Sequence, residues 1–352
     1  MRNDVRIAYL IEPRFRGGTS GAVARELAVA AGIGRVSVHA VRSAMFRDDA
    51  VAPALADAMD DLGIALEWAQ GPVAADIVIL HNPSFLRFQA ALDLRIVARE
   101  LVVVTHENFL RPGGHEAFDV ARCLRQIDVA SLALRKTLAP VSPANRRTVV
   151  DWLAGAGADA RWDICDWDWH NICDFEMRAP TAAPADRRGR HSRPGYEKFP
   201  PPDVMDACFP RHAAANVILG AEPVLREAAE RPHWAVYPFG AMPVEAFFGM
   251  IDFHVYFTAP TWRESFGRVL AEAIAAGKVA ISDPETASTF GGGVIGAAPG
   301  EVDALIAAMI ADPRRYRDHV RAAQAALAAF SAASFGRRLA GLAASVSGKA
   351  AA

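Results

Sequence analysis

Two carboxylates in the second half of the chain stand eight residues apart and are the first candidates for binding chemistry. They are Glu264 and Glu272, within the segment WRESFGRVLAEAIAAG at residues 262–277. A strand-like run at 252–258 precedes the segment, and Gly277 is a stop signal for the helix that the segment predicts. A carboxylate can accept two hydroxyl hydrogen bonds, and bonds to a charged acceptor are the stronger kind. The pattern therefore suits a ligand that carries hydroxyl groups.

The start of this predicted helix is a candidate anion site. Ser265 is the expected N-cap, which leaves the N–H groups of Phe266, Gly267 and Arg268 unpaired at the carboxyl ends of the strands. A helix start of this kind suits a diphosphate, and Gly267 lets the backbone come close to it. The alternative is structural: Glu272 pairs with Arg268 one turn earlier on a solvated helix face.

A basic cluster, RRGRHSRPGYEK at residues 187–198, is the second candidate. A diphosphate carries two negative charges, which an arginine fork and a lysine point charge together can neutralise. The alternative is a solvated basic loop without a ligand.

Glycines follow the first predicted strand. The strand-like run at 6–11 leads into Gly17 and Gly18 and then into a helical pattern, an order that forms a phosphate cradle. The full dinucleotide fingerprint is not present. A turn that needs positive φ explains the glycines equally well.

Two further strand ends carry histidine, in ILHNP at 79–83 and VTHEN at 104–108. Polar residues at the carboxyl ends of parallel strands are where active residues collect. His106 is the candidate, whereas His81 is expected to hold its loop by hydrogen bonds. Ser142 is expected to be the N-cap of the helix that follows the next strand.

These segments together resemble the group 1 (family 4) glycosyltransferases of the GT-B type. That family carries a Glu, seven residues and a second Glu in its second domain, which match Glu264 and Glu272. The resemblance implies that Glu264 contacts the donor sugar hydroxyls and that Glu272 contacts the nucleotide ribose. It also implies catalytic roles for His106, beside the transferred sugar, and for Arg190 and Lys198, at the donor diphosphate.

Further donor-binding residues are implied by the same resemblance: Gly17, Gly18, Arg193, Ser265, Phe266, Gly267 and Glu272. The chain departs from the family around the basic cluster. The family has an apolar strand before its Gly-Arg, whereas residues 181–186 are rich in Pro and Ala, and Phe199 rather than Gly follows Lys198. The donor base is expected near residues 237–242.

The segment CDWDWHNIC at 165–173 offers a competing, metal-based interpretation. Asp166 and Asp168 mimic the Asp-x-Asp of GT-A glycosyltransferases, and the two cysteines with His170 mimic zinc ligands. Neither spacing is standard, and a fourth zinc ligand is not apparent. We therefore expect no metal and no cofactor besides the nucleotide-sugar donor.

Composition restricts the class of protein. A chain of 352 residues with a net charge of −2 is long enough for two α/β domains and has no global attraction for nucleic acid. Four cysteines form no disulfide framework. We expect a cytoplasmic protein, because the sequence shows neither a signal peptide nor an apolar stretch of about 18 residues. Peripheral membrane association stays open, since it needs only one basic or amphipathic patch.

Strand-like runs alternate with helical patterns, as in βα repeats. Strands are expected at 6–11, 36–41, 76–81, 101–106, 138–142, 216–219, 233–239, 252–258 and 278–283. Helices are expected at 19–31, 51–62, 85–98, 116–135 and 265–276. We predict an α/β fold of two Rossmann-like domains, with a nucleotide-sugar cleft between them. The acceptor-side domain is 1–165, the nucleotide-sugar domain is 166–330, and 331–352 is a helix returning toward the first domain, with a tail.

The resemblance implies a retaining, metal-independent glycosyltransferase that moves a sugar from a nucleoside-diphosphate sugar to an acceptor that the sequence does not identify. An oxocarbenium-like transition state and a departing diphosphate place the catalytic load on cations and a helix dipole. Two alternatives share the fold: a sugar-nucleotide epimerase and a non-catalytic nucleotide-sugar-binding protein. A Rossmann dehydrogenase fits less well, because the glycine fingerprint is incomplete.

Overall fold

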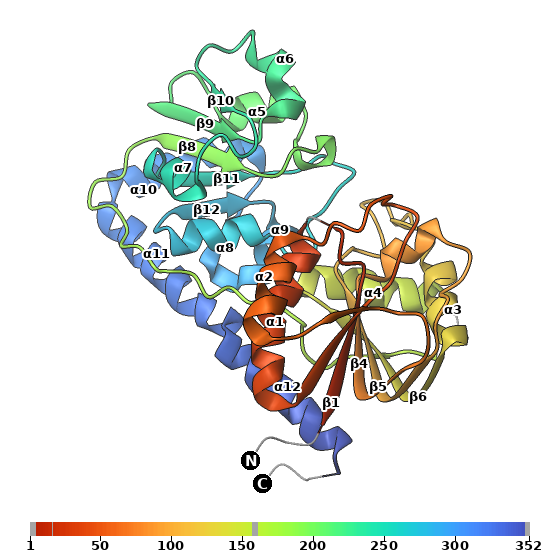
Figure 1. The fold of residues 1–352 in the computed structure, drawn as a ribbon. Helices are drawn as coiled ribbons and strands as arrows, with labels where there is room; N and C mark the ends of the chain where they lie inside the picture. The colour runs from red at the N-terminus through yellow and green to blue at the C-terminus, as the bar shows by residue number, and fades with distance from the viewer. Residues whose placement is uncertain (1–4, 16, 157–160, 349–352) are drawn as a thin grey trace. The chain divides into compact units, whose positions relative to one another are not determined.

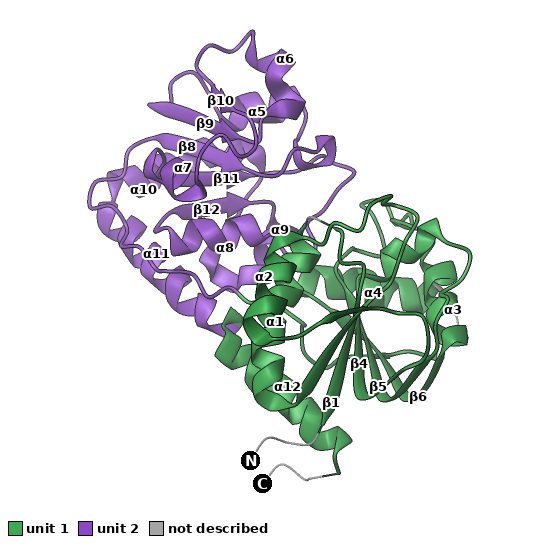
Figure 2. Cartoon of the chain, viewed as in Figure 1, with its two compact units in different colours: residues 1–172, 330–352 green, residues 173–329 purple. Residues whose placement is uncertain are grey.

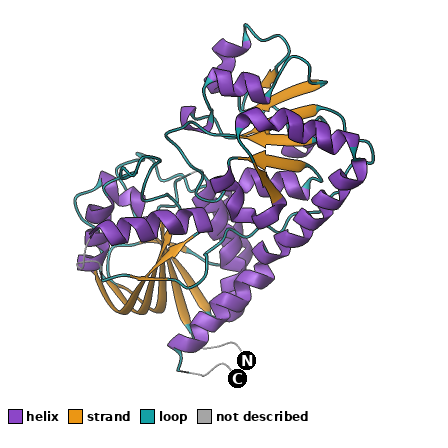
Figure 3. Ribbon diagram, turned by 180° about the vertical axis from the view of Figure 1, so that it is seen from behind, coloured by secondary structure: helices purple, strands orange, loops and turns teal. Residues whose placement is uncertain are grey.

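The computed structural model describes residues 5–15, 17–156 and 161–348, which form two compact units (Figure 2). Unit 1 comprises residues 1–172 and 330–352, and unit 2 comprises residues 173–329. Each unit is built on a parallel sheet flanked by helices (Figure 3), as predicted for two Rossmann-like domains. Within the described ranges, no helix is both long enough and apolar enough to span a bilayer.

Unit 1 contains a 7-stranded parallel sheet in the order β3-β2-β1-β4-β5-β6-β7 (Figure 1). The order reverses beside β1, which pairs with both β2 and β4, and ligands of such sheets bind at this kind of switch point. The strands are β1 (Arg6–Ile11), β2 (Arg35–Ala40), β3 (Leu66–Trp68), β4 (Val73–His81), β5 (Ile96–Thr105), β6 (Ser131–Pro140) and β7 (Asp163–Ile164).

The helices of unit 1 cover both faces of its sheet. Alternate residues of β1 point to opposite faces, and Ala8 and Leu10 join the core that contains Val120 and Cys123 of α3. Helix α12 packs against α1 and β4. The helices are α1 (Gly18–Ile33), α2 (Pro53–Leu62), the 3₁₀ helix η1 (Pro83–Phe88), α3 (Val120–Ala130), α4 (Pro143–Ala156), η6 (Leu327–Phe330, ending in unit 1) and α12 (Ala332–Val346).

Two predicted helices of unit 1 are wrong in extent. Only a 3₁₀ helix occupies the start of the predicted helix 85–98, because β5 already begins at Ile96. The predicted helix 116–135 is shortened by β6, which begins at Ser131. At 131–135 the side chains of a half-exposed strand imitate a helical pattern, whereas residues 89–95 form a loop.

Unit 2 contains a 6-stranded sheet in the order β10-β9-β8-β11-β12-β13. Its strands are β8 (Arg187–His191), β9 (Ala215–Leu219), β10 (Ala235–Tyr237), β11 (Phe253–Tyr256), β12 (Val279–Ser282) and β13 (Val294–Gly296). Its helices are η2 (Tyr196–Lys198), α5 (Pro202–Cys208), η3 (Glu222–Val224), α6 (Leu225–Ala228), α7 (Val244–Gly249), α8 (Arg268–Ala275), α9 (Pro284–Ala287), η4 (Ser288–Gly293), η5 (Pro299–Glu301), α10 (Val302–Ala311) and α11 (Pro313–Ala326).

A central strand of unit 2, β8, is composed of basic residues and glycine, where the sequence predicts a loop. Interior parallel strands are normally apolar. Here Arg188 is buried, and its Nε donates to Asp186 Oδ1 at 2.7 Å while its Nη1 lies 2.6 Å from Asp303 Oδ1. A Cβ on Gly189 would lie 2.7 Å from Ile251 Cγ2, so glycine is needed for this close packing. Paired arginines thus replace an apolar strand.

Candidate functional site

Glu264 is the centre of a charged cluster in unit 2, in the turn between β11 and α8. Its Oε1 accepts from Lys198 Nζ at 2.7 Å and from the Tyr256 hydroxyl at 2.5 Å. Burial acts to raise the pKa of Glu264, but the interactions with Lys198 and Tyr256 outweigh it and lower that pKa. Both bonds use Oε1. Glu264 is therefore an ionised carboxylate at the centre of this cluster.

The basic cluster supplies two cations to this carboxylate. Lys198, at the end of η2, is mostly buried, and its Nζ lies 5.0 Å from the ring centroid of Trp262. Arg193 is exposed, and its positive charge also contributes to the lowered pKa of Glu264. Lys198 therefore contacts Glu264, and the charge of Arg193 also acts on that carboxylate, while the donor-binding roles of all three stay predictions.

Arg190 lies in a different place from the one predicted. Its side chain is 0% exposed, and its Nη1 donates to the Phe257 carbonyl at 3.0 Å while its Nη2 donates to the Lys198 carbonyl. The guanidinium also stacks 4.0 Å from the ring centroid of Phe199. This arrangement does not fit the predicted contact with a diphosphate. Arg190 faces the interior, and its bond to the Lys198 carbonyl positions the backbone that carries Lys198.

The start of α8 also differs from the prediction. The N-cap is Gly267 rather than Ser265, and Gly267 has a positive φ of 81° that L side chains rarely adopt. Phe266 is buried against Phe290, with ring centroids 5.4 Å apart. The first helical N–H groups therefore belong to Arg268 and the residues after it. Gly277, with φ of 76°, follows the helix as the predicted stop.

Glu272 lies on α8 with a side-chain partner on each of its oxygens. His191 Nε2 lies 3.0 Å from Oε2, and Arg268 Nε donates to Oε1 at 2.9 Å, the pairing that the sequence offered as the structural alternative. Burial acts to raise the pKa of Glu272, yet His191 and Arg268 lower it overall. Glu272 and Arg268 also line a cavity of about 300 Å³ in unit 2. Its predicted ribose contact stays a prediction.

A second histidine, His254, contacts His191. His254 is completely buried in β11, and its Nε2 lies 3.1 Å from His191 Nδ1. Burial, followed by the charges of His191 and Arg190, holds the pKa of His254 well below its ordinary value. The ring of Tyr256 stacks on His254 with centroids 6.0 Å apart. No sequence motif pointed to His191, His254 or Tyr256, although His191 and Tyr256 are the last residues of β8 and β11.

In unit 1, His106 follows β5 and contacts His81 at the end of β4. His106 Nε2 lies 2.9 Å from His81 Nδ1, and His81 Nε2 lies 3.4 Å from Glu26 Oε2. Burial, and then the neighbouring His81, hold the pKa of His106 well below its ordinary value. His81 Nε2 is buried and, among the described residues, makes no hydrogen bond despite its proximity to Glu26. His106 is half-buried, so this network ends at the surface in an imidazole.

Glu26 is a buried carboxylate that the sequence gave no reason to select. Its Oε2 accepts from Trp169 Nε1 at 3.0 Å, whereas its Oε1 has no hydrogen-bond partner in the described part of the chain. Tyr9 stacks on His81 with ring centroids 5.7 Å apart, and burial, reinforced by Glu26, raises the pKa of Tyr9. Glu26 lies among buried α1 residues, a position where a charge is expected to be paired.

The predicted glycine cradle begins α1. Gly17 is the N-cap of this helix with φ of −147°, and Gly18 is its first residue, so neither glycine serves a turn of positive φ. A Cβ on Gly17 would lie 2.3 Å from the Phe15 ring, which explains the small residue at that position. Arg16 lies outside the described residues. Phosphate binding by Gly17 and Gly18 stays a prediction.

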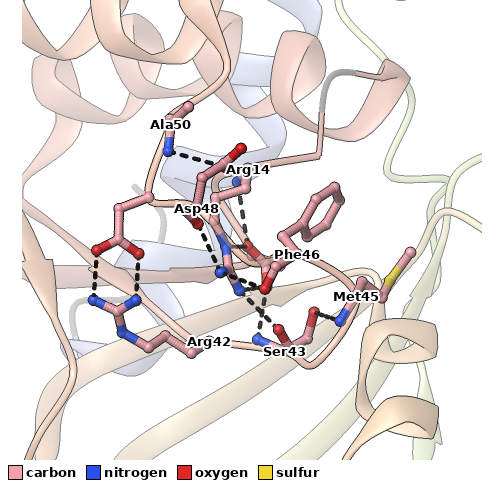
Figure 4. A network of polar contacts seen from close by, with 9 residues as sticks. Arg14, Arg42, Ser43, Met45, Phe46, Asp48 and Ala50 are labelled. Carbon is pink, nitrogen blue, oxygen red and sulfur yellow. Dashed lines mark hydrogen bonds and ion pairs between the residues drawn. The ribbon is translucent and has the colours of Figure 1, made fainter.

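A buried ion pair holds the loops around this helix start (Figure 4). Arg14 Nε and Nη2 each donate to a Glu12 oxygen at 2.7 Å, and Glu12 Oε2 also accepts from the Ser43 N–H at 2.7 Å. Arg14 Nη1 donates to the carbonyls of Phe46 at 3.1 Å and Asp48 at 3.0 Å. The loop after β2 is thereby bound to the end of β1.

The residues that suggested a metal site at 165–173 make other contacts in the structure. Asp168 Oδ1 accepts from Arg146 Nε at 2.7 Å, and neither Cys165 nor Cys173 is part of a disulfide in the described residues. Across the described ranges, no group of three or more His, Cys, Asp or Glu side chains is arranged to hold a metal ion. Ser142 caps α4 as predicted, because its hydroxyl accepts from the Asn145 N–H at 3.0 Å.

No family model and no curated protein matches the sequence. Solved structures match the fold. An Anabaena protein, Alr3699/HepE, in complex with UDP and glucose aligns at a TM-score of 0.66 with 14% identity, over 97% of this chain and 100% of that one. Sucrose-phosphate synthase from Thermosynechococcus elongatus aligns at 0.61 with 14% identity, over 98% and 99%. The galactosyltransferase WaaB aligns at 0.59 with 13% identity, over 96% and 98%. The chain therefore has the two-sheet fold of GT-B glycosyltransferases.

Proposed function

We propose that this protein is a glycosyltransferase that uses a nucleoside-diphosphate sugar, with UDP as the favoured nucleotide. The observation that carries the proposal is the cluster of Glu264, Lys198 and Arg193 beside the carboxyl ends of the unit 2 strands. It stands on a fold whose solved relatives include structures in complex with UDP and UDP-glucose. A carboxylate for sugar hydroxyls and two cations for a diphosphate match such a donor.

In the proposed reaction each group has one task. Glu264 Oε2 accepts hydrogen bonds from hydroxyls of the donor sugar. Lys198 and Arg193 stabilise the charge that grows on the departing diphosphate, which makes a metal ion unnecessary. Retention of anomeric configuration and the role of His106 beside the sugar belong to the same proposal.

The proposal is tested with a panel of nucleotide sugars, first by thermal shift and then by nucleotide release with and without added sugar acceptors. We expect a UDP-sugar to raise the unfolding temperature and UDP release to persist in a chelator. Conversion of the donor without a second substrate would instead identify an epimerase. Binding without turnover across a broad acceptor panel would identify a non-catalytic binding protein, and no binding of any nucleotide sugar would refute the proposal.

A further inference from the structure

The contact between His191 and Glu272 joins the sheet of unit 2 to helix α8. The His191 side chain is 7% exposed, and its Nε2 lies 3.0 Å from Oε2 of Glu272. The rings of Phe247 and Phe248 pack on the imidazole, each with its centroid 5.2 Å away. Hydrogen bonds are electrostatically stronger where water is largely excluded. The contact is therefore suited to holding Glu272 in one orientation.

The hydrogen bond between His191 and Glu272 has one possible direction. Burial acts to raise the pKa of Glu272, but the bonds from His191 and Arg268 lower it overall, so Glu272 is ionised. An ionised carboxylate only accepts hydrogen bonds. His191 therefore carries a proton on Nε2.

His254 decides the state of the other His191 nitrogen. Nε2 of His254 lies 3.1 Å from His191 Nδ1, and burial holds the pKa of His254 well below its ordinary value, so His254 is neutral. Its Nδ1 is buried and, within the described part of the chain, has no hydrogen-bond partner. A proton on that nitrogen would be an unsatisfied buried N–H, which is rare in folded proteins. The single proton of His254 therefore lies on Nε2 and is donated to His191 Nδ1.

The two bonds fix both the tautomer and the ring orientation of His191. His254 donates to Nδ1 and Nε2 donates to Glu272, so a turn of the His191 ring would break both bonds. A second proton on His191 would lie on Nδ1 and would force the His254 proton onto its unpartnered nitrogen. The tautomer of a histidine is set in this way by the bond that its other nitrogen makes.

Glu272 keeps acceptor capacity after these contacts. Arg268 donates to Oε1 and His191 to Oε2, whereas the two oxygens of a carboxylate together offer about four acceptor positions. The Glu272 side chain is 22% exposed and lines the cavity of about 300 Å³, so a ligand can reach it. Arg268 comes from the same helix, whereas His191 ties the carboxylate to the sheet. A carboxylate held in this way can accept from two neighbouring hydroxyl groups.

We propose that His191 is a positioning residue that sets the ribose specificity of the donor site, by holding the Glu272 carboxylate against the two ribose hydroxyls. This inference rests on the proposed function, because it takes the nucleotide of the donor as the ligand of Glu272. His254 contributes by fixing the tautomer of His191. Both imidazoles act through Glu272 rather than on the nucleotide, as supporting residues do in a site of fixed geometry.

The test is calorimetric titration with UDP and with 2′-deoxy-UDP. The unaltered protein should bind UDP about tenfold more tightly, since the deoxy compound lacks one hydrogen bond to a charged group. His191→Leu should remove most of this difference. His191→Gln should keep most of it, because the amide nitrogen of glutamine can take the place of Nε2 and donate to Glu272. Phe247→Leu is the matched control: it removes a ring that packs on His191 but no hydrogen bond, so it should lower stability and keep the preference for UDP.

Nitrogen NMR of the protein with isotope-labelled histidine reads the tautomer directly. The signals of His191 are identified by their absence from His191→Gln. At neutral pH we expect a proton on Nε2 and none on Nδ1. His254→Phe should remove this tautomer preference and weaken the discrimination between the two nucleotides. The tautomer is measured in the unaltered protein, so this result does not depend on whether His191→Leu folds.

Four outcomes would overturn the proposal. They are a proton on His191 Nδ1, equal binding of UDP and 2′-deoxy-UDP by the unaltered protein, an unchanged preference for UDP in His191→Leu, and a preference lost equally in Phe247→Leu, which would assign the effect to packing. Failure of the unaltered protein to bind UDP at all would refute the proposed function and this proposal with it. The failure of the positioning role alone is thus distinguished from the failure of the proposed function.

Discussion

Both units contain the same unusual arrangement, a carboxylate against a pair of hydrogen-bonded histidines with a tyrosine ring stacked on one of them. The members are Glu26, His81, His106 and Tyr9 in unit 1, and Glu272, His191, His254 and Tyr256 in unit 2. In each unit the carboxylate comes from a helix and at least one histidine from a strand. We call these the two Glu-His-His networks.

The networks differ in which end reaches the surface. In unit 1, Glu26 is buried and His106 is the half-buried end, whereas in unit 2 His254 is buried and the Glu272 side chain is 22% exposed. Unit 1 therefore presents an imidazole and unit 2 presents a carboxylate that Arg268 also binds. The same residue types thus yield opposite surface chemistry, according to which member is buried.

The largest expected effect is on the rate of sugar transfer, and it tests whether unit 2 binds the donor sugar. Glu264→Gln should lower transfer at least about a hundredfold while the fold is kept, because a neutral amide loses charge-assisted bonds to hydroxyls. Transfer rates with a UDP-sugar and circular dichroism are measured together. Glu230→Gln, at an exposed position of the same unit, is the control. A folded Glu264→Gln protein with normal turnover would contradict the assignment.

The next effect separates the cations of unit 2 from its buried arginine. Lys198→Ala and Arg193→Ala should each weaken UDP binding about ten- to a hundredfold, since one charge-assisted bond is worth roughly 1.5 to 3 kcal/mol. Arg190→Met should mainly lower the free energy of unfolding, because it leaves two buried carbonyls without their donor. Calorimetric titration with UDP and urea denaturation distinguish the two classes, with Arg226→Ala as the control. If Arg190→Met and Arg193→Ala weaken UDP binding equally, Arg190 does contact the diphosphate.

A smaller effect compares the two carboxylates of the Glu-His-His networks. Glu26→Gln should lower the free energy of unfolding by about 1–3 kcal/mol, because Glu26 is buried and bonded to Trp169. Glu272→Gln should cost less stability, since its side chain is partly exposed, and should instead weaken nucleotide binding. Urea denaturation of both variants measures the difference. A larger decrease in the free energy of unfolding for Glu272→Gln than for Glu26→Gln would contradict the proposed difference between the two networks.

The smallest effect concerns pH. Because the folded-state pKa values of His106 and His254 lie below their unfolded values, the unfolded chain binds more protons as pH falls below about 6.5. Stability should therefore be fully present above that pH and decline below it. The lowered pKa values of Glu264 and Glu272 add a second loss below about pH 4.5. Denaturation series at several pH values test this, and His254→Asn should flatten the first decline.

The candidate site was predictable from sequence where its chemistry lies in consecutive residues. Glu264, Lys198 and Arg193 were identified from short motifs, and the structure brings them together. Arg190 was misplaced because a strand of basic residues carries no apolar alternation, so nothing in its sequence says which side chains face inward. The N-cap was misplaced by two residues, since a serine is the usual signal and the positive φ of Gly267 is visible only in the backbone.

The sequence by itself determined the local features of this protein. The alternation of apolar runs predicts the β/α order, and the segment from Glu264 to Gly277 predicts a carboxylate, a helix start and a helix stop, because each depends on neighbours only a few residues apart. Only the tertiary structure decided which polar side chains are buried together. Glu26 meets His81, and His191 meets Glu272, across sequence separations at which no local pattern operates. The reason is that burial and pairing of charge are set by the packing of distant strands and helices, which also decides whether an imidazole or a carboxylate reaches the surface.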